Sequence, residues 1–168
     1  MFDRFGEFDS AEELNKKADE LKALGDTEGV YVLAAENGID KEDAKDYLNG
    51  DASELATPMM AAAGKLKVES EHLGIGGILK DWKDSVMVSC VEDAQMRAAV
   101  RKKGKNLKGC IAELIKYSFE NKVKVSDQIV DEVKVMHNGK TVPMRKPLYL
   151  GVPDRTQTKR LIEKYYMG

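Results

Sequence analysis

The side chains that most often carry out catalysis are scarce in this sequence. It contains two histidines, His72 and His137, and two cysteines, Cys90 and Cys110. Nucleophilic catalysis needs a base beside the nucleophile, and neither cysteine has a neighbouring histidine or a Cys-x-x-Cys spacing. A structural zinc site usually takes four ligands at short spacings, which this sequence does not offer. We therefore predict a protein that is not an enzyme and that uses no metal or cofactor.

The glycines at residues 74–77 do not match a phosphate-binding loop. A dinucleotide-binding loop has the pattern G-x-G-x-x-G after a strand, whereas Gly74-Ile75-Gly76-Gly77 follows a predicted helix. A P-loop would continue to Gly-Lys-Ser or Gly-Lys-Thr, and this segment does not. We interpret the segment as a hinge.

A basic cluster is the most distinctive group of charged residues. It spans a predicted short helix, a glycine turn at Gly104 and the start of the next helix, which Asn106 caps. The free N–H groups at a helix start favour anions, and neighbouring lysines strengthen that preference. The cluster either binds nucleic-acid phosphates or the acidic surface of another protein, or it is a loop that only increases solubility. Its members are Arg97, Arg101, Lys102, Lys103, Lys105 and Lys108.

The first half of the chain has the opposite charge. Residues 1–76 contain 8 Lys and Arg against 18 Asp and Glu, and residues 77–168 contain 19 against 11. This asymmetry indicates two regions with different partners, or two regions that attract each other. A dense acidic face can imitate nucleic-acid phosphates and occupy a basic groove, although an ordinary acidic surface has the same composition. The outward acidic residues of the first helices are Glu12, Asp19, Glu20, Glu42, Asp43 and Asp46.

The elements that position these charges are predicted from capping residues and periodicity. Ser10, Asp26 and Asp40 each precede an apolar helical pattern that ends at a glycine. Thr57-Pro58 begins a fourth helix. Asn138-Gly139 between alternating residues predicts a β-hairpin over residues 133–144. Further helices are expected near residues 78–92, 93–101, 106–119, 126–130 and 154–166, with a short strand at residues 147–153.

The predicted fold is therefore mostly α (α+β): a bundle of short capped helices with one small β element near the C-terminus. We expect two domains, an acidic helical module at 1–74 and a basic helical domain at 78–168. No run of about 20 apolar residues could span a membrane, and the start does not resemble a secretion signal. Cys90 and Cys110 both lie in apolar helical patterns, so we expect them to be reduced and to pack as small buried apolar side chains. We expect a cytoplasmic protein.

The second half resembles the PcfK-like proteins of mobile genetic elements. The resemblance is carried by Leu79-Lys80-Asp81-Trp82, by Cys90-Val91-Glu92-Asp93, by residues 100–114 and by the ends Tyr149–Pro153 and Tyr165–Gly168. It covers about residues 78–168 and is most specific at Lys-Gly-Lys-Asn-Leu-Lys-Gly-Cys. The family includes type II anti-CRISPR proteins, which inhibit the RNA-guided nuclease Cas9. The predicted hairpin is an insertion beside the shorter family pattern.

The resemblance implies an anti-CRISPR protein that binds Cas9 or its guide-RNA complex and blocks DNA binding or cleavage without catalysis. Cas9 holds guide and target in positively charged channels, which an acidic face could enter. The alternative is a DNA-binding accessory protein of a conjugative element or phage, which would use the basic cluster for nucleic-acid contact. We also expect a homodimer, because the two halves carry opposite charges.

Overall fold

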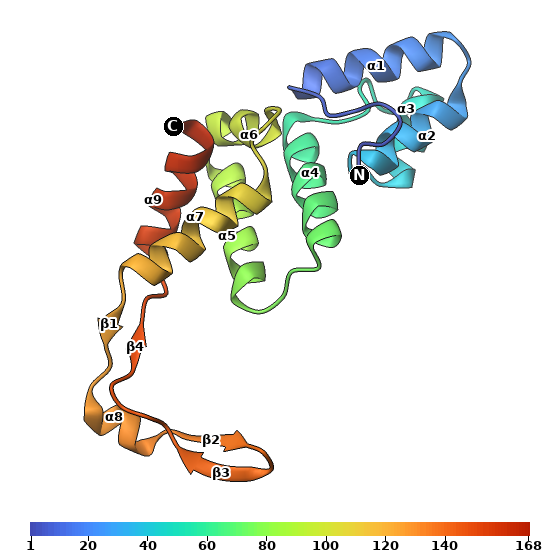
Figure 1. Cartoon of the computed structure of the whole chain (residues 1–168). Coiled ribbons are helices and arrows are strands. Elements are labelled where there is room, and N and C mark those ends of the chain that lie inside the picture. Colours follow the sequence, from blue (N-terminus) through green and yellow to red (C-terminus); the bar gives the residue numbers. More distant parts are fainter.

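The computed structural model describes all residues, Met1–Gly168, and consists mainly of helices (Figure 1). Two short antiparallel strand pairs lie near the C-terminus, so the predicted fold class is confirmed. No helix combines the length and the apolar character needed to cross a membrane. In chain order the elements are α1 (Ala11–Ala23), α2 (Thr27–Glu36), α3 (Lys41–Asn49), α4 (Pro58–Leu73), α5 (Ile78–Glu92), α6 (Ala94–Arg101), α7 (Leu107–Glu120), β1 (Val123–Lys124), α8 (Asp127–Glu132), β2 (Lys134–His137), β3 (Lys140–Pro143), β4 (Tyr149–Leu150) and α9 (Arg155–Met167).

Most helices begin where the sequence places a capping side chain. Ser10 accepts a hydrogen bond from the Glu13 N–H at 3.2 Å, which satisfies one of the free donors of the first turn. Asp26, Thr57, Asp93, Asn106 and Asp154 do the same for their helices. Asp40 makes no such cap, because its carboxylate accepts a hydrogen bond from Lys67 of α4 at 2.8 Å. The cap predicted at Asp40 is thus replaced by a tertiary ion pair.

The chain has two hydrophobic cores. The first core belongs to α1–α3, which we call the N-terminal unit, and includes the fully buried Leu14, Val30 and Leu33. The second belongs to α4–α7 and α9, which we call the helical body (Figure 1). Its central side chains are Leu66, Trp82, Val86, Cys90, Met96, Val100, Leu107, Cys110, Leu114, Ile162 and Tyr166.

The packing of α4 places the change between the two hydrophobic cores earlier in the chain than the predicted domain boundary. Ala62 and Leu66 of α4 lie in the core of the helical body, while Ala61 lies in the core of the N-terminal unit. A division at residues 74–78 would cut through the helical body, because α4 precedes it and α5 follows it. The change between cores comes at the start of α4. Gly74 and Gly77, at positive φ, instead form the turn between two packed helices.

Residues 121–154 leave the helical body as a projecting arm (Figure 1). The strands β1 and β4 pair antiparallel and form its stalk, with Val123 opposite Leu150 and Lys124 opposite Tyr149. At its far end lie α8 and the β2–β3 hairpin, whose turn at Asn138-Gly139 has two positive φ angles, as the sequence predicts. Within the arm, Val130 and Pro153 are the buried side chains. The pairing of β1 with β4 was not predicted.

Candidate partner-binding surfaces

The six acidic residues predicted as an outward face lie on α1 and α3. Five are exposed and Asp43 is half-buried. A hydrogen bond joins the two helices: the Tyr47 hydroxyl of α3 donates to Asp19 of α1 at 2.6 Å. Burial, followed by this hydrogen bond, raises the pKa of Tyr47. Glu20 pairs with Lys17 and Glu42 with Lys45, both on their own helices and in exposed positions.

The acidic face continues into the segment that joins α3 to α4. Asp43 and Asp46 line a hollow of about 350 Å³ with Asp51 and Glu54. The sequence reasoning missed the last two carboxylates, because they lie outside the helical patterns. No group of three or more His, Cys, Asp or Glu residues is arranged to hold a metal ion. The arrangement is therefore a carboxylate-lined surface spread over α1, α3 and the following loop.

The predicted basic cluster is divided by the fold, and only half of it faces solvent. Arg97 donates to the carbonyls of Cys90 and Val91, at 2.9 and 3.3 Å, at the end of α5. Lys105 donates to the Tyr165 carbonyl at 2.6 Å and lies over the Tyr165 ring. Arg101 is 1% exposed and so cannot contact a partner. The exposed members are Lys102, Lys103 and Lys108.

Arg101 belongs instead to a buried polar network between the N-terminal unit and the helical body. Its Nη2 donates a 2.6 Å hydrogen bond to Oδ1 of Asn37, which ends α2 and is itself fully buried. Its Cζ lies 6.0 Å from the centre of the Phe2 ring. Burial lowers the pKa of Arg101, against the opposing effect of the carboxylates of Glu7 and Glu69. The residue thus joins the two cores.

Lys65 of α4 is the centre of this network and is fully buried. Its ammonium group forms an ion pair with Glu7 and donates to the carbonyls of Lys102 and Lys105 at 2.8 and 2.7 Å. Glu69, one turn later, accepts a 2.7 Å hydrogen bond from the Leu107 N–H at the start of α7. Burial raises the pKa of Glu69, although this hydrogen bond and Lys65 act in the opposite direction.

Two further contacts fix the junction. Asp9 accepts a 2.9 Å hydrogen bond from the Lys103 N–H, so residues 7–9 are held to the glycine turn between α6 and α7. Gly38 and Gly64 pass so closely that a Cβ on Gly64 would lie 2.1 Å from the Asn37 carbonyl oxygen. Sequence reasoning missed this junction. Lys65 and Glu69, which interrupt the apolar stripe of α4, were the signal that could have found it.

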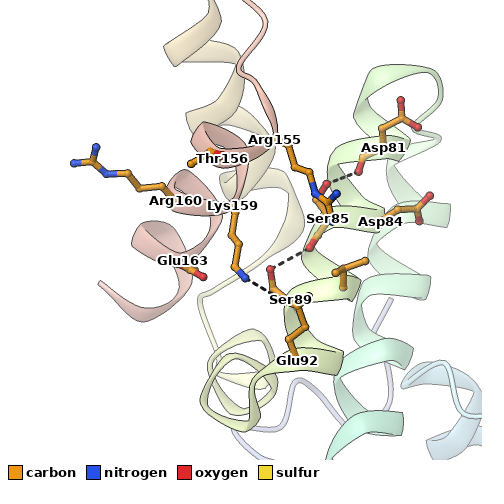
Figure 2. Close-up of a pocket in the computed structure, with 11 residues that line it drawn as sticks. Asp81, Asp84, Ser85, Ser89, Glu92, Arg155, Thr156, Lys159, Arg160 and Glu163 are labelled. Carbon is orange, nitrogen blue, oxygen red and sulfur yellow. Dashed lines mark hydrogen bonds and ion pairs between the residues drawn. The ribbon is translucent and has the colours of Figure 1, made fainter.

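A hollow of about 570 Å³ lies between α5 and α9 (Figure 2). Asp81, Asp84 and Glu92 line the α5 side, and Arg155 and Lys159 line the α9 side. In Figure 2, Arg155 extends toward Ser85 across the groove. Lys159 and Glu92 close one end with a 2.8 Å ion pair, which raises the pKa of Lys159 and lowers that of Glu92. The groove suits a polar segment that carries both signs of charge.

The residues with nucleophilic side chains lie apart from these surfaces. Cys90 and Cys110 are free and buried in the core of the helical body, as the sequence predicts. Burial raises the pKa of Cys90 to about 11 and that of Cys110 to about 12, so both thiols stay protonated at neutral pH. His72 lies exposed near the end of α4, and His137 is exposed at the tip of the arm.

Comparison of the chain with protein-family models, with curated proteins and with solved structures finds no match.

Proposed function

We propose that this protein inhibits Cas9 by binding it, and that the acidic side chains of α1 and α3 make the contact. The observation that carries the proposal is the carboxylate-lined surface of the N-terminal unit, from Asp19 on α1 to Glu54 before α4. Cas9 holds its guide and target strands in positively charged channels. A helical surface with many carboxylates complements such a channel in charge. The resemblance of the second half to the PcfK-like proteins supports the same proposal.

The rigid junction strengthens this proposal. A charged surface competes best with a nucleic acid when its charges need no rearrangement on binding. The N-terminal unit is tied to the helical body by Lys65, Arg101 and the Gly38–Gly64 contact. Its carboxylates are therefore presented at a fixed position relative to the rest of the chain.

A cleavage assay with purified Cas9, guide RNA and target DNA tests the proposal. Excess protein is expected to suppress cleavage, and the variant Glu20→Lys/Glu42→Lys/Asp46→Lys is expected to lose most of that suppression. The matched control is Glu71→Lys/Glu113→Lys/Glu120→Lys, which makes the same charge change at exposed positions of the helical body. Undiminished cleavage with wild-type protein, or equal loss in both variants, would contradict the proposal.

A second candidate, a DNA-binding accessory protein of a conjugative element, is supported by the exposure of Lys102, Lys103 and Lys108 around the turn at Gly104. It predicts duplex binding that weakens steeply as salt rises. This second candidate alone predicts that reversing these three charges abolishes duplex binding, which a mobility-shift assay at low salt measures.

A further inference from the structure

The β2–β3 hairpin is a basic ribbon at the far end of the arm. Residues 133–153 contain four Lys and Arg residues and no Asp or Glu. Lys146 is paired with Asp131 at 2.5 Å, whereas Lys134, Lys140 and Arg145 form no ion pair. All three are exposed. Unlike the basic cluster of the helical body, most of these positive charges are not used to hold the fold together.

The two faces of the ribbon differ. Val135 and Val142 are opposite each other and half-buried, on the face that also carries Val133 and Met144. The register places Lys134 opposite Pro143 and Met136 opposite Thr141 on the other face, where all four are exposed. Met136 is 72% exposed, a high value for a large apolar side chain. The outer face therefore combines the cation Lys134 with the exposed Met136, while Lys140 lies opposite His137 on the Val135 face, next to the turn.

The position of the ribbon separates it from the acidic end of the molecule. The arm and the N-terminal unit lie on opposite sides of the helical body (Figure 1). A polyanion bound at the hairpin would thus lie away from the carboxylates of α1 and α3. The separation allows a protein with a net charge of −2 to hold a polyanion at one end.

We propose that the arm binds double-stranded nucleic acid, with the β2–β3 ribbon in a groove and Lys134, Lys140 and Arg145 on the phosphates. The major groove of B-form DNA, about 12 Å wide, admits a two-stranded ribbon. The three cations supply contacts that do not depend on base sequence, and Met136 supplies an apolar contact to base edges. This proposal does not depend on inhibition of Cas9, and no nuclease is needed to test it.

Fluorescence anisotropy with the full-length protein and a labelled duplex of about 20 base pairs tests the proposal, at about 50 mM and about 200 mM salt. The variant Lys134→Glu/Lys140→Glu/Arg145→Glu is expected to bind at least about tenfold more weakly at the lower salt. Each lost phosphate contact also reduces the slope of log affinity against log salt by about 0.9. The neutral variant Lys134→Gln/Lys140→Gln/Arg145→Gln is expected to fall between the two, and circular dichroism should be the same for all three proteins.

The matched control is Lys102→Glu/Lys103→Glu/Lys108→Glu, which places the same charge change on the helical body. It is expected to bind the duplex nearly as well as wild type, and the single strand of the same sequence is expected to bind more weakly than the duplex. The proposal is overturned by an absence of duplex binding at low salt, by arm variants that bind like wild type, or by equal binding of the single strand. An arm that contacts an acidic protein surface instead would give the first of these results.

Discussion

The two ends of this molecule are attached to the helical body in opposite ways. The N-terminal unit is joined through buried charges, with Lys65 at the centre, and through the close passage of Gly38 and Gly64. The arm is joined through two strands of two residues each and shares no core with the helical body. Buried polar groups that are hydrogen-bonded favour one arrangement, because displacing Lys65 would leave a buried charge and its acceptors without partners. The acidic end is thus held by buried polar contacts, whereas the basic end is held by two short strands and no shared core.

Lys65→Met is the change expected to weaken the rigid end most. It removes the partner of Glu7 and leaves Glu69 and two backbone carbonyls without their cation. Breaking a buried ion pair on one side costs about 3–5 kcal/mol in the free energy of unfolding, which urea denaturation measures. The control Lys67→Met removes an exposed lysine paired with Asp40 and should cost no more than about 1 kcal/mol. Equal losses in the two variants would show that the network does not stabilise the junction.

Gly64→Ala is expected to have the next largest effect. Alanine favours a helix over glycine by about 1 kcal/mol, but its Cβ would overlap the Asn37 carbonyl oxygen. Relieving an overlap with backbone atoms forces α4 away from the end of α2, at a net cost of about 1–3 kcal/mol. Gly76→Ala is the control, since its Cβ would meet no atom within 4 Å. A Gly64→Ala protein as stable as wild type would contradict the close packing at this point.

A smaller effect is expected from pH. Burial raises the pKa of Glu69 in the folded protein above its ordinary value, so the folded state binds this proton more readily than the unfolded state. Protonation of Glu69 therefore favours folding, and its contribution becomes more favourable as pH falls from 7 through the raised pKa. Glu69→Gln removes this contribution. On acidification from pH 7 to pH 4, wild type should thus gain stability relative to Glu69→Gln. A constant difference in unfolding free energy over this pH range would contradict this.

The smallest effect on global stability is expected in the arm. Val130 is fully buried within the arm but belongs to neither core. Val130→Ala should loosen α8 and the hairpin while leaving the unfolding midpoint of the helical body unchanged. Hydrogen exchange measures both, because amides of residues 127–144 should exchange faster in the variant and those of α7 should not change. A lower unfolding midpoint of the helical body, or faster exchange throughout the protein, would show that the arm and helical body form one cooperative unit.

The local structure of this chain could be predicted because short-range chemistry determines it. Ser10, Asp26, Asn106 and Asp154 cap helices where they were expected, and Asn138-Gly139 forms the predicted turn. The placement of Arg101 in a partner-binding basic cluster was wrong, because its side chain is buried. Its neighbours Lys102 and Lys103 are exposed, and nothing in a run of basic residues shows which one meets a buried amide from residue 37.

Long-range pairing was equally hidden from sequence reasoning. The strand at residues 123–124 is too short to give an alternating pattern, and its partner lies beyond a helix and a hairpin. Asp51 and Glu54 join the acidic surface only because the loop before α4 folds beside α3. In each case the deciding contact joins residues whose own sequence surroundings carry no sign of it.

The buried network also has a consequence for how the chain is made. Glu7, Asn37 and Asp9 find their partners at residues 65 and 101–105. During synthesis the N-terminal unit leaves the ribosome first, at about 5–20 residues per second, with these three side chains still facing water. Its final packing must wait until the turn at Gly104 has emerged. In a nascent chain stalled before that point, the side of the N-terminal unit that later contacts the helical body would remain exposed to water.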